Sequence, residues 1–220
     1  MHTGRGSVFV GFDPGGKSAV AVLVAEHSAL REARVATVDS VDDAMAWVRD
    51  QVGTGSIIAA GVDALLFWET KKSGWRGADR WLQNTYPDCR KSVICANSLY
   101  GAMAVQGMAF AMRLRQAFPD VALLETHPKV LYVAKARARY PRDWPDSLDA
   151  RKASDWLRGE LGLKEKALSF ASDHEWDAAL SAWVAWSHTT RPWPRDLVSE
   201  SPDRSDILMP AGPVDYPWPT

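Results

Sequence analysis

Two aspartates each end an apolar, strand-like run in the first third of the chain. Asp13 ends the run at residues 8–13, and Asp63 follows the run at residues 57–62. If these runs are parallel neighbours in a sheet, both carboxylates lie at the same edge. Because neighbouring carboxylates repel each other, a chain that gathers them usually holds a cation between them. The pair therefore predicts a metal site, although the proline and glycines after Asp13 are equally typical of an ordinary turn.

Glu125 ends another strand-like run, at residues 121–125. Ligands and catalytic groups of open α/β sheets gather beyond the carboxyl ends of the strands, so Glu125 is a further candidate for the same site. His127 follows two residues later and precedes Pro128. Its position suits a metal ligand or a proton shuttle, and it also suits a turn residue before proline.

A third group of polar residues opens a helix that we expect at residues 173–187. Asp173, His174 and Asp177 lie on one side of its first turn, at positions i, i+1 and i+4. Asp173 also suits the N-cap of the helix, whereas Asp177 lies too deep for that role. Small residues further along the helix would allow it to pack closely on a sheet. Asp177 is therefore the stronger candidate for a ligand.

Basic residues that could contact a phosphate backbone occur beside the first turn, in the polar segment 68–86 and after residue 125. Tryptophans are interleaved with them in the segment 68–86. The candidate nucleic-acid contacts are Lys17, Arg76, Arg80, Lys129, Lys135, Arg137 and Arg139. Exposed, solvated basic residues are the more common explanation, and the net charge of −1 supplies no overall attraction for nucleic acid.

The elements that must position these residues follow from the hydrophobic pattern. We expect strands at residues 8–13, 18–25, 31–38, 57–62 and 121–125, and helices at 41–52, 98–118, 149–160 and 173–187. Asn97 or Ser98 would cap the second helix. The tight link after Asp13 predicts that the second strand runs antiparallel to the first, and the helical crossover places the strand before Asp63 parallel to the first. The first strand would then be central in a mixed five-stranded sheet flanked by helices.

The composition is that of a globular α/β protein, with 46% hydrophobic and 24% charged residues. A single domain at residues 7–190 would be followed by a proline-rich C-terminal tail at 191–220, which holds seven of the 13 prolines. We find no run long enough to span a membrane and no signal-peptide pattern, so we expect a cytoplasmic protein without a membrane partner. The oligomeric state is left open.

The order of the expected elements resembles the RNase H-like superfamily, and its RuvC-type resolvases are distantly similar in layout. Closer is a family of predicted nucleases labelled domain of unknown function 429. The segments that carry this resemblance are Gly11-Phe12-Asp13, Gly61-Val62-Asp63-Ala64, Glu125-Thr126-His127-Pro128 and Asp177-Ala178. The resolvases carry an acidic residue three positions before the last aspartate, where this chain has His174.

The resemblance implies a divalent-metal-dependent nuclease that hydrolyses phosphodiester bonds of DNA or RNA. Asp13 would bridge two ions, Asp63 and Asp177 would each hold one, and Glu125, Asp173 or His174 would complete the shells. Mg²⁺ suits an all-oxygen site, whereas Mn²⁺ better tolerates a histidine ligand. Two alternatives are a non-catalytic scaffold with the same fold and, less favoured, a phosphate-binding ATPase-like protein. ATPase-like proteins of this fold contain two copies of it, whereas this chain is long enough for one copy.

Overall fold

A mixed six-stranded sheet forms the centre of the protein, in the order β3-β2-β1-β4-β6-β9. The computed structural model describes residues 6–53, 55–70, 74–94, 101–163, 168–201 and 206–219. The strands of the sheet are β1 (Ser7–Asp13), β2 (Ser18–Glu26), β3 (Ala29–Val38), β4 (Ile57–Val62), β6 (Ala122–Glu125) and β9 (Val214–Asp215). Strand β2 runs antiparallel to β1 and β3, whereas β4, β6 and β9 continue the sheet from β1 in parallel.

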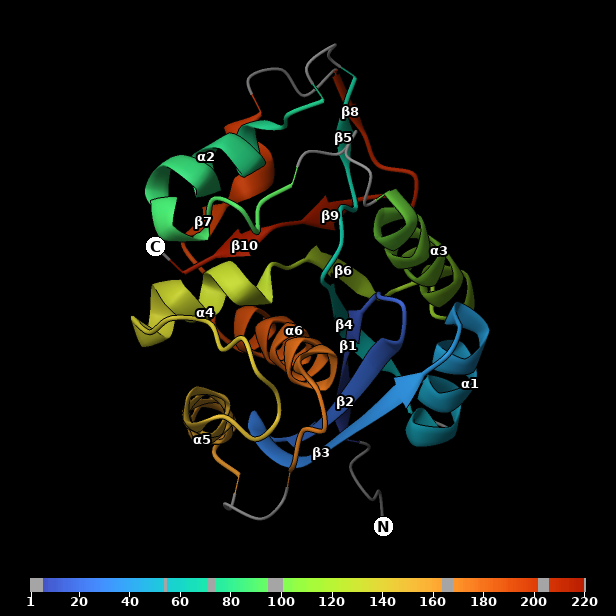
Figure 1. Ribbon diagram of the computed structural model, residues 1–220. Helices are drawn as coiled ribbons and strands as arrows, with labels where there is room; N and C mark the ends of the chain where they lie inside the picture. The colour runs from blue at the N-terminus through green and yellow to red at the C-terminus, as the bar shows by residue number, and fades with distance from the viewer. Residues whose placement is uncertain are drawn as a thin grey trace.

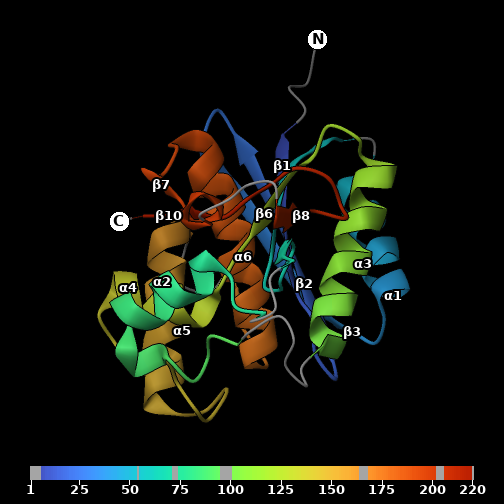
Figure 2. The ribbon, with the colours of Figure 1, turned by 90° about the horizontal axis from the view of Figure 1, so that it is seen from above.

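Helices cover both faces of the sheet (Figure 1). One face is covered by α1 (Val41–Val52) and α3 (Gly101–Ala117), and the other by α4 (Pro128–Ala136), α5 (Leu148–Leu161) and α6 (Asp173–Thr190). Seen from above, α1 and α3 lie together on one side of the strands and α6 lies on the opposite side (Figure 2). The remaining elements are β5 (Trp68–Glu69), α2 (Gly77–Thr85), η1 (Pro87–Cys89), β7 (Arg195–Asp196), η2 (Leu197–Glu200), β8 (Ile207–Leu208) and β10 (Pro217–Trp218).

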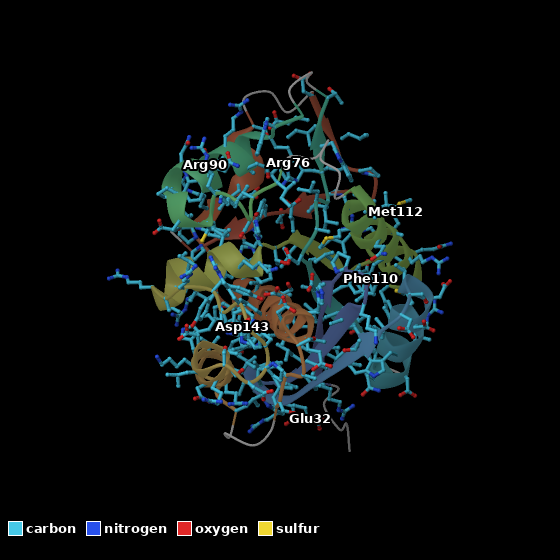
Figure 3. The ribbon with its side chains drawn as sticks, in the orientation of Figure 1. Glu32, Arg76, Arg90, Phe110, Met112 and Asp143 are labelled. Carbon is cyan, nitrogen blue, oxygen red and sulfur yellow. The ribbon has the colours of Figure 1, made fainter. Side chains whose placement is uncertain are left out.

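Alternation along β1 divides its side chains between two hydrophobic cores. Val10 and Phe12 belong to the core beneath α1 and α3, whereas Phe9 belongs to the core beneath α6. Phe12 stacks on Phe110 with ring centroids 4.2 Å apart. Figure 3 shows Phe110 on the sheet side of α3 and Met112 on its outer side, where 48% of Met112 is exposed.

Helix α6 packs directly on the backbone of the two central parallel strands. A Cβ atom at Gly11 in β1 would overlap the carbonyl oxygen of Ala178, and one at Gly61 in β4 would overlap the carbonyl oxygen of Ser181. Only glycine allows a helix to approach both strands this closely. The contact fixes the distance between the start of α6 and the carboxyl ends of β1 and β4.

The structure confirms the predicted strand neighbours and adds elements that the sequence analysis did not predict. Strand β1 is central, β2 is antiparallel, and β1 lies beside the strand that precedes Asp63. Helix α4 occupies the start of the basic stretch, for which no helix was predicted. Helix α3 lies within the predicted range 98–118, and its predicted caps, Asn97 and Ser98, lie outside the described residues.

The proline-rich segment supplies the sixth strand, which the expectation of five strands did not include. Strand β9 pairs with β6, and β10 pairs with β7. Arg115 of α3 donates to the carbonyl oxygens of Ala211 and Pro213, which ties the segment to the helix layer. Tyr216 is 1% exposed, so this part of the chain packs into the same body as the rest of the sheet. Among the described residues, no helix combines the length and apolar character needed to cross a membrane.

Gly11→Ala tests the contact between helix and strand. The new Cβ meets backbone atoms of Ala178 and Ala182, which cannot move without shifting α6. We expect a loss of about 1–3 kcal/mol or more in the free energy of unfolding, measured by urea denaturation. Gly159→Ala is the matched control, because nothing lies within 4 Å of that Cβ on α5 and alanine should stabilise the helix by about 0.5–1 kcal/mol. Equal effects of the two substitutions would contradict the close contact.

Candidate metal centre

Three aspartates meet where β1, β4 and α6 converge. Asp13 ends β1, Asp63 directly follows β4, and Asp177 lies in the second turn of α6. One carboxylate oxygen of each lies within 4.8 Å of those of the other two. Asp13 is 2% exposed and Asp177 is 1% exposed. The structure therefore brings together the three residues that the sequence analysis favoured as ligands.

The two-residue repeat of a strand explains why these carboxylates share a face. Asp13 lies two residues after Gly11, and Asp63 lies two residues after Gly61. Both glycines face α6, so both aspartates project toward that helix. The peptide N–H of Asp63 donates to the carbonyl oxygen of Phe12 at 2.9 Å, which holds the two strand ends together.

Hydrogen bonds orient two of the three carboxylates. The Nδ1 atom of His174 lies 2.6 Å from Oδ2 of Asp13. Tyr140 donates its hydroxyl to Oδ2 of Asp177 at 3.0 Å, and the Nζ atom of Lys129 lies 3.9 Å from the same oxygen. The other oxygen of Asp177, Oδ1, is buried and has no hydrogen-bond partner among the described residues. Its lone pairs are available to a ligand.

Burial and mutual repulsion dominate the electrostatics of the cluster. Burial, together with the carboxylate of Asp63, raises the pKa of Asp13 well above its ordinary value. Burial and Asp13 do the same to the pKa of Asp177. Burial raises the pKa of Asp63 to about 7 even though the charge of Lys129 opposes the rise. The carboxylates in turn raise the pKa of Lys129 against the effect of its burial, so this lysine stays charged beside them.

These features fit a divalent cation. Three carboxylate oxygens within 4.8 Å of one another can all contact one ion. A cation would also provide a partner for Oδ1 of Asp177, which otherwise bears the cost of an unsatisfied buried acceptor. Oxygen ligands of this kind suit Mg²⁺ and Mn²⁺. Each ion bound would displace protons from the cluster.

The structure places Glu125 outside this cluster and Arg76 in the interior. The Nη1 atom of Arg76 lies 2.8 Å from Oε2 of Glu125, and Nη2 lies 2.6 Å from Oε1. The peptide N–H of Leu66 donates to Oε2 as well, at 2.8 Å, so both oxygens are engaged. Arg76 is 1% exposed and also binds Asp79, and Figure 3 shows it among the side chains between α2 and the sheet. We therefore revise both roles: Glu125 anchors Arg76 rather than a metal, and Arg76 is inaccessible to a phosphate backbone.

Strand register explains the different direction of Glu125. Val62 pairs with Glu125 in the parallel ladder, so Glu125 corresponds to the residue before Asp63. Leu123 packs in the core beneath α1 and α3, and Glu125 follows it by one repeat on that face. The residue that faces α6 here is Thr126, whose hydroxyl lies 2.8 Å from that of Ser181. A shift of one residue thus separates the strand-end acids onto two faces.

The other candidate residues differ in where the structure places them. Asp173 and Lys129 line a cavity of about 980 Å³ together with Arg137 and Arg139. Lys17 and Arg80 are exposed and line neither this cavity nor a second one of about 360 Å³ beside Asp63. Lys135 packs over the ring of Trp183, with Nζ 4.9 Å from its centroid, which indicates a structural role.

Sequence analysis missed three residues around the site. Tyr140 belongs to an irregular segment without a periodic pattern, so nothing in the sequence placed it beside Asp177. Lys91 lies after η1, far along the chain from the acids, yet it lines both cavities with Lys129. Arg142 lines the larger cavity, and its membership of the basic stretch was the signal available.

Comparison of the chain with family models, curated proteins and solved structures found no match.

Asp63→Asn tests the electrostatic state of the metal-free cluster. The pKa of Asp63 is raised from 3.8 to about 7, so between these values the native state holds a proton that the unfolded chain has lost. Rising pH across this window therefore favours unfolding, and the asparagine variant escapes the effect. We expect the variant to gain stability over the wild type, more at about pH 8 than at about pH 5.

The difference between the two proteins should be measured by urea denaturation in a chelator. Comparing the pair cancels the opposite contribution of His127, whose pKa burial lowers to about 4. A stability difference that does not change with pH would show that Asp63 is ionised normally in the native protein.

Proposed function

We propose that this protein is a divalent-metal-dependent phosphodiesterase that cleaves nucleic acid on an RNase H-like framework. The observation that carries the proposal is the convergence of Asp13, Asp63 and Asp177, whose ligand oxygens lie within 4.8 Å of one another. The order β3-β2-β1-β4-β6, with β2 antiparallel and α6 closing the site, supports the framework. An RNase H-like fold requires this arrangement of its first five strands and its closing helix.

The residues of the site have distinct tasks in this reaction. Asp13, Asp63 and Asp177 would hold the cation, and a bound Mg²⁺ or Mn²⁺ would supply an activated water and neutralise charge on the phosphate. His174 fixes the carboxylate of Asp13 and Tyr140 fixes that of Asp177, which keeps both oxygens aimed at one point.

Lys129 is the basic side chain that reaches furthest toward the cluster among those lining the larger cavity. Its Nζ atom lies 3.9 Å from Asp177, and 36% of the side chain is exposed. A cationic group that is part buried and part accessible can hold an oxygen of the scissile phosphate beside the carboxylates. It also offsets the repulsion that the three clustered acids would exert on an approaching polyanion.

The cavity of about 980 Å³ supports a nucleic-acid substrate in preference to a small phosphate ester. Its basic lining residues are Lys91, Lys129, Arg137, Arg139 and Arg142, against the acids Asp88 and Asp173. Their net positive charge lies next to the metal centre rather than over the whole surface. A phosphate backbone lying along this cavity would pass the carboxylates at Lys129.

Asp177→Asn tests the proposed activity. The wild type should cleave a DNA or RNA substrate in Mg²⁺ or Mn²⁺ and be inactive in EDTA, and the variant should lose the cleavage because a carboxamide is a poor metal ligand. The variant should also show a smaller rise in melting temperature than the wild type on adding metal, while its metal-free form stays folded. Asp149→Asn is the matched control, since this aspartate on α5 is 66% exposed and lines neither cavity.

The substrate screen should include single-stranded, duplex and branched DNA and RNA. If no nucleic acid is cleaved in either metal, the hydrolytic proposal fails and a scaffold role is favoured. If wild type and Asp177→Asn gain the same thermal stability from the metal, Asp177 is not a ligand.

Arg137→Ala and Arg139→Ala test the basic cavity. Each arginine is exposed and lines the cavity, so each loss should remove about one phosphate contact. The slope of log affinity against log salt should then fall by roughly 0.7–0.9 per substitution. Fluorescence anisotropy of labelled oligonucleotides in EDTA measures this without cleavage. Arg31→Ala on β3 is the control, because its side chain is 58% exposed and lines neither cavity; an equal change there would mean that binding is nonspecific.

A further inference from the structure

His127 lies at the edge of the aspartate cluster, between the end of β6 and the start of α4. Its Nε2 atom lies 3.1 Å from the carbonyl oxygen of Ser92. A carbonyl oxygen only accepts hydrogen bonds, so Nε2 carries the hydrogen. The neutral ring then presents an unshared electron pair at Nδ1.

The Nδ1 atom has no hydrogen-bond partner among the described residues, although it is buried. It lies 4.0 Å from Oδ1 of Asp63, too far for a hydrogen bond. Two donor atoms that each lie about 2.0–2.2 Å from one metal ion can be separated by this distance. Two acceptor atoms that are not hydrogen-bonded to each other therefore lie beside the aspartate cluster.

We propose that Nδ1 of His127 and Oδ1 of Asp63 form a nitrogen-and-oxygen site for a second cation, next to the ion held by the aspartates. The inference rests on the proposed function and names a ligand that the strand-end acids alone do not supply. Glu125 cannot take this place, because Arg76 and Leu66 occupy both of its oxygens.

The surroundings of His127 match those of a metal-binding histidine. Ligating histidines usually donate their second ring nitrogen to a carbonyl or carboxylate, which fixes the tautomer, as Ser92 does here. Asp63 and His127 both line the cavity of about 360 Å³, which leaves room for water or phosphate oxygens to complete the shell. The Nδ1 atom of His174 already bonds to Asp13 at 2.6 Å, so His174 could bind metal only through Nε2, and the variant His174→Ala tests that alternative.

An imidazole ligand changes which metal the site prefers. Mg²⁺ strongly favours oxygen ligands, whereas Mn²⁺, a transition-metal ion, accepts an imidazole nitrogen more readily. With His127 as ligand, the second site should bind Mn²⁺ more tightly than Mg²⁺. The site formed by the three aspartates should show a smaller difference in affinity between these two ions.

Mn²⁺ spectroscopy tests the proposal directly. The wild type is labelled with ¹⁵N-histidine, stripped of metal and then loaded with Mn²⁺. Pulsed EPR of this sample should show coupling between the electron spin of Mn²⁺ and a histidine nitrogen. His127→Ala should lose this coupling and His174→Ala should keep it. Absence of coupling in the wild type, or its persistence in His127→Ala, would overturn the proposal. If His127→Ala fails to fold, the wild-type spectrum and His174→Ala still decide, because coupling that disappears in His174→Ala assigns the nitrogen to His174 and overturns the proposal.

Calorimetric titration supplies a second measurement. We expect two Mn²⁺ ions per wild-type chain, and in His127→Ala one of them lost or bound at least about tenfold more weakly. His27→Asn is the control for adventitious binding at an exposed histidine and should keep both ions. Two equally tight ions in His127→Ala would overturn the inference alone, since Asp177→Asn and the cleavage assay still test the proposed function. If the wild type binds no Mn²⁺, both fail.

Discussion

The close packing of α6 on the backbones of β1 and β4 is the constraint on which the site depends. Gly11 and Gly61 leave no side chain between helix and strands, so the carbonyl oxygens of Ala178 and Ser181 lie directly against them. This contact places the carboxylate of Asp177 on α6 next to the carboxyl ends of β1 and β4. With larger residues at either glycine, α6 would be displaced from the sheet and Asp177 would be moved away from its two partners.

The protein treats its buried acids in two different ways. Glu125 and Asp79 both form ion pairs with Arg76, with oxygen–nitrogen distances of 2.6 Å in each pair, and burial raises the pKa of Glu125 while the charge of Arg76 opposes the rise. Asp13, Asp63 and Asp177 all lie near the charge of Lys129, and repulsion between carboxylates adds to burial in raising the pKa values of all three carboxyl groups. Buried charges that are neither paired nor bound to metal are costly. The contrast within one molecule is the physical case for a cation at the aspartates.

The C-terminal segment contributes to the same region. Strand β9 extends the sheet beyond β6, and Tyr216 lines the cavity beside Asp63 and His127. Proline-rich composition predicted an extended or wrapping tail; in the described part of this segment, short strands pair with β6 and β7, and Arg115 donates to the carbonyl oxygen of Pro213. This segment therefore forms part of the body that surrounds the candidate site.

The sequence by itself determined the strand pattern, the neighbours of β1 and the three aspartates, because these depend on local periodicity and on where apolar runs end. Only the tertiary structure decided the roles of Glu125 and Arg76. A single-residue difference in strand register turned Glu125 to the opposite face, where an arginine from a distant helix start neutralises it. The positions of Lys129, Tyr140 and His127 around the carboxylates likewise depend on contacts between segments far apart in the chain. Such long-range contacts leave no periodic signal in the sequence.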